Sequence, residues 1–296
     1  MAGARNARAR GTIVVAVDGS ATALQAVRWA ALESALRQCA LRLLLSSASA
    51  PRTGLSALEI VGGREWLCWN GERVLSEAAA MAHHVAGDIE VSTELTSDSI
   101  VPALVESSER VAMIVAGSHG RGPVRRALLG SVSTAVTKRA HCPVAIVHRD
   151  SVIAVDSDER PIVVGVDEEY AAIDCALVEA SLRGVAVTAV RACDEMLTAF
   201  ALSGELGRVR ADERLTLTEH LAPSASRYPE VPLEPMVVFD SPAHALLVHS
   251  GDAQLLVVGR HGWAGPTGIA TRSTRAALLH HGLCPTLIVP ETSEQR

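Results

Sequence analysis

The chain is predicted to fold into two tandem doubly wound α/β domains, each a five-stranded parallel sheet with helices on both faces. Three observations carry this prediction. Short apolar runs alternate with stretches of helical spacing, as in consecutive βαβ units. The apolar runs are β-branched and unbroken, as in strands buried on both faces. Finally, the first half of the sequence recurs in the second half.

The repeat sets the domain count. Three segments of the first half return in the second half, in the same order: Thr12–Asp18 as Pro161–Asp167, Val111–Gly120 as Ala253–Gly262, and His141–Val147 as Leu283–Val289. A period near half of the chain indicates two copies of one domain, because the repeats of solenoids are far shorter. We expect a flexible tail at 1–10, a domain at 11–148, a charged linker at 149–160, a second domain at 161–290 and a tail at 291–296.

The elements of the first half follow from residue type and spacing. The expected strands are Ile13–Val17, Leu41–Leu45, Ile89–Leu95, Ala112–Ala116 and Val144–Val147. The third alternates, which places it nearer the sheet edge. Helices are expected after Ser20, which can cap one, and within Gly71–Val85, Ser99–Ser107 and Val132–Arg139. The segment 49–71 is not assigned, and its Trp66 and Trp69 suggest packing or a lid.

A glycine-rich loop follows the fourth strand. The spacing is Gly117-x2-Gly120-x9-Gly130-Ser131, and it leads directly into a helix. Glycines let backbone N–H groups approach an anion closely, and a helix N-terminus adds unpaired donors and a partial positive charge. The order of strand, glycine loop and helix is therefore typical of a phosphate-binding segment.

This spacing resembles the ATP-binding signature of the universal stress protein family, and the resemblance covers essentially the whole chain, twice. In that family the first and fourth strands are neighbours, so Asp18 and Gly117 would face one crevice beyond the carboxyl ends of the strands. The resemblance implies that Asp18, in an Asp-Gly-Ser turn with Gly19 and Ser20, contacts the ribose or adenine side of ATP. It also implies that Leu44 lies against the base.

The resemblance also implies a phosphate site. Gly117 and Gly120 shape the loop, and the phosphates are held by the start of the next helix, at Gly130, Ser131, Val132 and Ser133. Amides and a hydroxyl can bind phosphate without a charged side chain. His119 would be a neighbour of the phosphates or a bystander in an exposed loop, with a catalytic role as the alternative. Arg121 would add positive potential over the phosphates, although a solvated loop face explains it equally well. The implied cofactor is ATP, with Mg²⁺ carried on its phosphates and no metal ligand set from the protein.

Structural alternatives remain open for these residues. Asp18 can serve only as a turn or helix-capping aspartate. Gly120 can simply make a turn, and Ser131 can be an ordinary N-cap. Taken together at this spacing, however, they favour a binding site.

The second half keeps only part of the pattern. Asp167, Gly259 and Gly262 survive, but Arg272-Ser273 stands where the first half has Gly130-Ser131. The Gly-Ser pair after the strand-one aspartate has become two glutamates, which would repel a triphosphate. We expect one ATP per chain, in the N-terminal half, with a degenerate second site. The competing hypothesis is that Arg272 supplies a replacement cation.

Composition excludes several classes of function. The net charge of −6 argues against a nucleic-acid binder, which needs clustered positive charge. No apolar run approaches the length of a membrane span, and no apolar segment follows the arginines of the first ten residues, so we expect neither a membrane nor a secretory protein. The six cysteines show no CxxC pair, which suggests reduced thiols in a cytoplasmic protein.

Signs of catalysis are sparse. The sequence contains neither the GxxxxGK[ST] loop of P-loop ATPases nor a Gly-x-Ser-x-Gly elbow, and its only lysine is Lys138. We therefore expect at most slow hydrolysis of bound ATP. The function expected from the resemblance is that of a nucleotide-dependent stress and signalling regulator. The alternative from another class is an interaction scaffold in which nucleotide is structural or absent.

The last strand of each half carries an expectation about assembly. Family members associate through this edge strand, and an exposed apolar edge invites pairing unless it is covered. Val144–Val147 and Thr286–Val289 are expected to pair with one another, so that the two domains are related by a pseudo-two-fold axis. A homo-oligomer, such as a dimer of tandem chains, or a regulatory protein partner is expected in addition.

Overall fold

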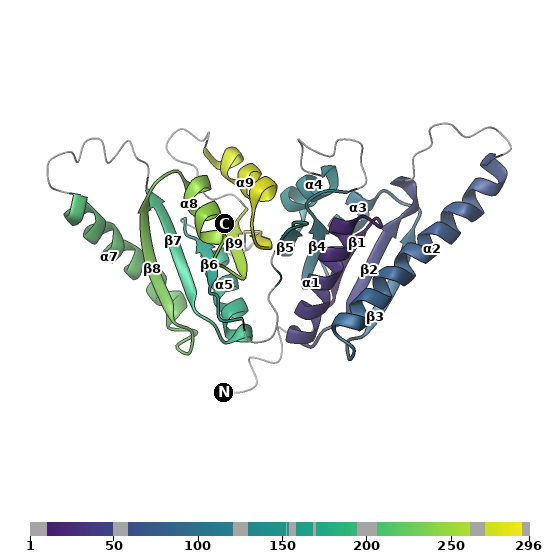
Figure 1. Ribbon diagram of the computed structural model, residues 1–296. Helices are drawn as coiled ribbons and strands as arrows, with labels where there is room; N and C mark the ends of the chain where they lie inside the picture. Colours follow the sequence, from purple (N-terminus) through teal and green to yellow (C-terminus); the bar gives the residue numbers. More distant parts are fainter. Residues whose placement is uncertain are drawn as a thin grey trace. The chain divides into compact units, whose positions relative to one another are not determined.

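The computed structural model describes residues 11–49, 59–120, 130–151, 153, 158–167, 170–193, 206–260 and 270–291. The chain divides into two compact units, Met1–Arg149 and Asp150–Arg296, and each unit alternates strands with helices (Figure 1). The predicted α/β class is confirmed in both.

Unit 1 is built on a five-stranded sheet. Its strands are β1 (Ile13–Val17), β2 (Leu41–Ser46), β3 (Val91–Thr96), β4 (Met113–Gly117) and β5 (Val144–Val147). All pairings are parallel, in the order β3-β2-β1-β4-β5. The β-branched residues at the centre of β1 are fully buried, as the unbroken apolar run predicts.

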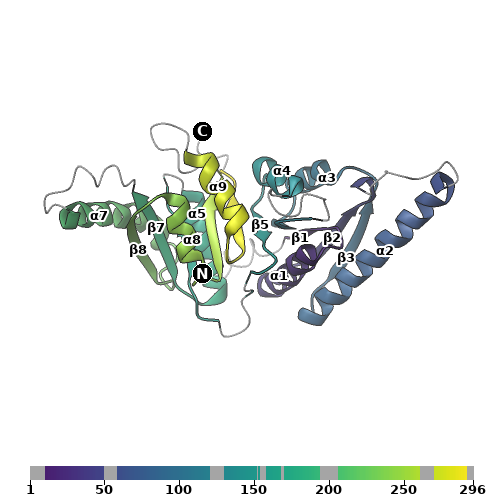
Figure 2. The ribbon, with the colours of Figure 1, turned by 45° about the horizontal axis from the view of Figure 1, so that its top comes forward.

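Helices cover both faces of this sheet. Figure 2 shows α1 (Ala21–Arg37) and α2 (Glu59–Val85) on one face, with α3 (Ile100–Ser107) and α4 (Ser131–Arg139) on the other. A short 3₁₀ turn, η1 (Ser47–Ser49), follows β2. The layers are those of a doubly wound fold, in which the connecting helices change face where the strand order reverses.

Helix α1 begins as its sequence predicts. Ser20 is its N-cap, and the Ser20 hydroxyl accepts a hydrogen bond from the Ala23 N–H at 3.1 Å. At the other end Gln38 adopts the left-handed conformation with φ of 53°. Glu33, inside the helix, is buried and pairs with Arg37 one turn later. This pairing offsets the cost of removing the carboxylate from water.

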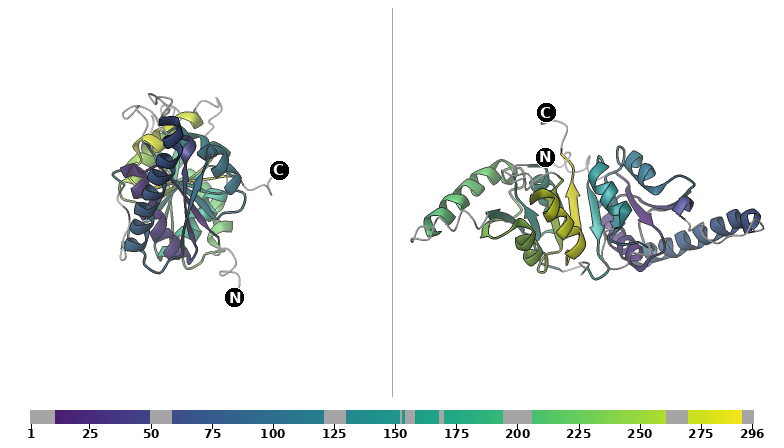
Figure 3. Two further views of the ribbon diagram at one scale, coloured as in Figure 1. Left: turned by 90° about the vertical axis from the view of Figure 1, so that its right-hand side faces the viewer. Right: turned by 90° about the horizontal axis from the view of Figure 1, so that it is seen from above.

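Helix α2 is longer than the sequence predicts. It begins at Glu59, not near Gly71, so Trp66 and Trp69 lie within a helix of 27 residues. The adjacent glycines Gly62 and Gly63 disfavour a helix locally and hide its first turns from pattern analysis. The helix extends past the ends of the strands it covers (Figure 3).

Unit 2 repeats the architecture. Its strands are β6 (Ile162–Gly165), β7 (Val187–Cys193), β8 (Leu233–Phe239), β9 (Leu255–Gly259) and β10 (Thr286–Val289), parallel in the order β8-β7-β6-β9-β10. The sheet packs against α5 (Tyr170–Arg183) and α7 (Leu206–Ala225) on one face and against α8 (Pro242–Ser250) and α9 (Ala270–His281) on the other. The repeat extends to a buried pair, Glu179 with Arg183, at the place of Glu33 and Arg37.

The end of the predicted linker packs against unit 2. Arg160 pairs with Asp158 and donates to the Ala253 carbonyl at 3.2 Å, while the Gln254 amide donates to the Arg160 carbonyl at 2.8 Å. These bonds fix residues 158–160 to the turn before β9. Among the described residues, no helix is both long enough and apolar enough to cross a membrane.

Candidate functional site

The candidate site lies where the strand order of unit 1 reverses. Chain connections run from β1 outward to β2 and β3, then return to β4 on the other side of β1. In such sheets ligands bind beyond the carboxyl ends of the strands at this reversal. Asp18 directly follows β1, and Gly117 ends β4, the parallel neighbour of β1. The structure therefore brings these two predicted residues to the same edge.

The Asp18 carboxylate has two distinct surroundings. Its Oδ1 accepts a hydrogen bond from the Ser20 N–H at 2.9 Å, which closes a turn in which Gly19 has φ of +73°. Its Oδ2 lies against Gly120, where an added Cβ would be only 2.7 Å away. Oδ1 thus has the role of a turn aspartate, which the sequence analysis left open as an alternative, and Oδ2 lies against the glycine loop.

The glycines of the motif allow close approach. A Cβ on Gly117 would meet the Thr22 side chain at 2.9 Å and its backbone carbonyl carbon at 3.0 Å, so β4 packs directly on α1. A Cβ on Gly130 would lie 3.3 Å from the Ser118 carbonyl oxygen. The Gly130 N–H donates to that carbonyl at 3.0 Å. This bond joins the start of the loop to its end.

Helix α4 presents its N-terminus at this point. Gly130 is the N-cap, which excludes Ser131 as N-cap and leaves no capping side chain. The N–H groups of a first helical turn have no partner within the helix, and here they include those of Ser131 and Val132. Ser133 is 2 % exposed, and its hydroxyl donates to the Gly117 carbonyl at 2.6 Å. Ser133 thereby fixes the helix to the end of β4, while only its amide remains for a ligand.

The other predicted residues are less directly placed. His119 is half-buried, with its Nδ1 3.0 Å from the Ser118 hydroxyl. Leu44, on β2, is 1 % exposed and forms part of the core of unit 1. Arg121 lies outside the described residues. The sequence analysis missed Thr22 and the Ser118 carbonyl. Only the position of Ser118 inside the glycine motif could have pointed to it.

The corresponding edge of unit 2 differs in its helix start. Asp167 follows β6 and is half-buried, and Gly259 ends β9. Gly262 lies outside the described residues. Arg272 and Ser273 lie inside the first turn of α9, because this helix begins at Ala270. Since Arg272 stands at the place of Gly130, Ala270 stands at the place of position 128 in unit 1. Helix α4 begins three positions later, at Ser131, so α9 begins earlier than α4 relative to the shared motif.

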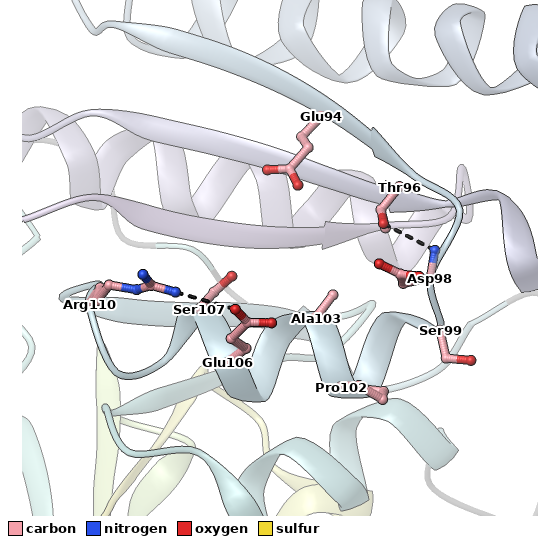
Figure 4. Close-up of a pocket in the computed structure, with 9 residues that line it drawn as sticks. All are labelled: Glu94, Thr96, Asp98, Ser99, Pro102, Ala103, Glu106, Ser107 and Arg110. Carbon is pink, nitrogen blue, oxygen red and sulfur yellow. Dashed lines mark hydrogen bonds and ion pairs between the residues drawn. The ribbon is translucent and has the colours of Figure 1, made fainter.

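Two cavities in unit 1 are lined by residues other than those of the candidate site. One, of about 400 Å³, lies between β3 and α3 (Figure 4). The other, of about 550 Å³, lies between the ends of α1 and α2. The five described cysteines are free thiols, and no group of three metal-ligating side chains occurs in the described part of the chain. Burial raises the pKa of Cys142 and Cys284 to about 12, which makes both poor nucleophiles.

Comparison with known proteins identifies the family. The family model for the universal stress protein family matches residues 9–148 and 159–290. Universal stress protein Rv2005c of Mycobacterium tuberculosis is 35% identical over 288 residues, covering 95% of this chain and 97% of its own. Universal stress protein Rv2623 of the same species is 31% identical over 286 residues, covering 95% and 96%. A crystal structure of a universal stress protein from Archaeoglobus fulgidus shares the fold, with a TM-score of 0.68 and 18% identity over 95% of this chain and 98% of that one. The chain therefore belongs to the universal stress protein family.

Proposed function

We propose that the chain binds one ATP at the carboxyl ends of the unit 1 strands, where the strand order reverses, and acts as a nucleotide-dependent regulator without catalytic turnover. The observation that supports this most is the convergence of Asp18, Gly117, Gly120 and Gly130 with the open N-terminus of α4. These groups are complementary to the two ends of a nucleotide. A carboxylate accepts hydrogen bonds from the hydroxyls of the ribose, and unpaired amides donate to the oxygens of the phosphates.

The chemistry divides between these two ends. In this proposal the Asp18 carboxylate accepts from the ribose or base, and the first-turn amides of α4 donate to the phosphates, where the helix dipole adds a positive potential. Mg²⁺ would be carried on the phosphates. The glycines keep side chains out of the space between the two groups, which a Cβ at Gly120 would enter.

Unit 2 supports a single site. The amides of Ser273 and Thr274 correspond to those of Ser131 and Val132, the proposed phosphate donors. Because α9 begins at Ala270, Ser273 is already its fourth residue and Thr274 its fifth. The N–H of a fifth helical residue bonds to the carbonyl four residues earlier, so the Thr274 amide is used within the helix. The early helix start thus withdraws one of the two donors that unit 1 keeps open, the one at Thr274.

The absence of turnover is part of the proposal. Lys138, the only lysine, lies in the last turn of α4 and is exposed, roughly 10 Å along the helix axis from Ser131. Phosphoryl transfer normally uses a lysine, an arginine or a metal-binding carboxylate at the phosphates. The proposal also includes a cytoplasmic location, where ATP is present and thiols stay reduced, and association into oligomers.

Calorimetric titration of the nucleotide-free chain with Mg-ATP tests the proposal. We expect a stoichiometry of about one that is lost in Gly130→Arg, which copies the residue of unit 2. Gly207→Arg is the matched control, because Gly207 is exposed and a Cβ there meets nothing within 4 Å. Two bound nucleotides, or binding that survives Gly130→Arg, would contradict the single site. No binding would favour the scaffold function instead.

A further inference from the structure

Strand β3 forms the outer edge of the unit 1 sheet. Among the described residues it pairs only with β2. The Leu41 N–H donates to the Glu90 carbonyl at 2.8 Å, so the backbone groups of Glu90 face β2. Backbone groups of successive strand residues point to opposite sides of the strand within the sheet. Those of Val91, Thr93 and Leu95 therefore point outward, away from β2.

The equivalent edge of unit 2 is interrupted. In β8 the Pro232 carbonyl accepts from the Val187 N–H at 2.8 Å, the same geometry as in unit 1. The register then places Pro235 at the position of Thr93. Proline has no N–H, so the middle donor of this edge is missing, a common protection of edge strands. Unit 1 has no such protection, since β3 reads VSTELT.

The open edge borders an acidic groove. The cavity between β3 and α3 is lined by three carboxylates and one guanidinium: Glu94, Asp98, Glu106 and Arg110 (Figure 4). Arg110 already pairs with Glu106 at 3.4 Å, and Glu94 lies 3.5 Å from Arg42 while its side chain stays 48% exposed. Asp98 is exposed and has no ion pair among the described residues. The groove thus keeps a negative charge for an incoming cation.

The two faces of β3 differ, so a strand that pairs with it would need different side chains at alternate positions. Glu94 and Thr96 line the groove on the α3 side. Leu95 lies on the α2 side, where an added Cβ at Gly71 would touch it at 3.0 Å. A strand placed beside β3 would present alternate side chains to the acidic groove and the others to the α2 side.

We propose that the open edge of β3 binds an extended protein segment with arginine or lysine at alternate positions, as a sixth strand of unit 1. The outward N–H and C=O groups of Val91, Thr93 and Leu95 bond to its backbone, which gives affinity. Its basic side chains lie along Glu94, Asp98 and Glu106, which gives selectivity for charge. This surface is separate from the proposed nucleotide site, so either proposal can fail without the other.

Fluorescence anisotropy with a labelled peptide of alternating arginine and valine tests the proposal on the full chain. Thr93→Pro copies unit 2 and removes the central donor, and we expect it to weaken binding about tenfold. Thr93→Val keeps the N–H and is the matched control, expected within twofold of wild type. A peptide with glutamate in place of arginine should not bind. Equal weakening by both variants, equal binding of both peptides, or no binding of the basic peptide would overturn the proposal.

Two further measurements keep the test decisive. Hydrogen exchange of the Val91, Thr93 and Leu95 amides in the wild-type chain should slow when the basic peptide is added, which needs no variant to fold. Unchanged exchange at all three would overturn the proposal. Sedimentation without peptide tests whether a second copy of the chain occupies the edge instead. A dimer that Thr93→Pro abolishes would assign the edge to a second copy and not to a basic segment.

Discussion

Gly120→Ala is expected to weaken nucleotide binding while leaving the fold of unit 1 nearly unchanged. An added Cβ would lie 2.7 Å from the Asp18 Oδ2, well inside ordinary contact. Gly120 does not have a positive φ, so alanine introduces no backbone strain there. The carboxylate is the group that must move, and its rotation weakens the bond from the Ser20 N–H to Oδ1.

The expected stability change is small. Loss of one hydrogen bond costs about 1 kcal/mol, and the reduced freedom of the unfolded chain returns about 0.4–1 kcal/mol. The melting temperature should therefore stay within about 4 °C of wild type. The affinity change should be larger. If Asp18 holds the nucleotide through a charge-assisted hydrogen bond, worth about 1.5–3 kcal/mol, displacing it weakens binding about ten- to hundredfold.

Calorimetric titration with Mg-ATP and thermal melting measure the two quantities on one sample. Gly207→Ala serves as control for the added methyl group, because its surroundings are open. A folded Gly120→Ala variant whose Kd stays within twofold of wild type would refute the role assigned to the contact between Gly120 and Asp18.

Three other predictions concern stability and the thiols. Gly117→Ala places a Cβ against the α1 backbone, which cannot rotate away, so we expect a loss of about 1–3 kcal/mol in the free energy of unfolding by urea denaturation; wild-type stability would contradict the packing. Arg160→Ala removes the hydrogen bond that lowers the pKa of Asp158, whose contribution of about 1 kcal/mol is present above the ordinary pKa of this carboxyl and is lost as the pH falls through the lowered value. The stability difference between wild type and this variant should therefore shrink in acid denaturation below about pH 4, and a constant difference would exclude the ion pair as its cause. Burial raises the pKa of Cys142 and Cys284 to about 12, so both thiols should resist thiol reagents at pH 8 in the folded chain, and rapid labelling of either would refute their burial. The free energy of unfolding should also fall as the pH rises from about 9 toward 12, because the unfolded thiols ionise first, and it should fall less in the double alanine variant.

The fold could be predicted from local pattern because its strands are buried. β1 and β5 have the predicted bounds, since an unbroken β-branched run reports burial on both faces. The start of α2 could not be predicted, because Gly62 and Gly63 are locally unfavourable in a helix and only the tertiary structure decides their state.

The candidate site could also be predicted only in part. Glycine spacing predicts which residues face the strand reversal, because each glycine marks a close backbone approach. What each glycine approaches, the Thr22 backbone or the Ser118 carbonyl, depends on contacts across the fold. The second half shows a further limit. Its sequence suggests a side chain in the way at Arg272, whereas the structure adds a backbone cause, the earlier start of α9.

The early start of α9 has a thermodynamic consequence. A ligand that binds only the folded state stabilises it by about 2.7 kcal/mol when its free concentration is a hundred times the Kd. With the Val132 amide open in α4 and the Thr274 amide used within α9, nucleotide in the proposed site would contact unit 1 and would stabilise the folded state of that unit directly. Two halves of one chain, copied from a common pattern, would then differ in resistance to heat and proteases whenever the cellular ATP level changes. Unit 2 would serve as an internal reference against which the state of unit 1 can be measured.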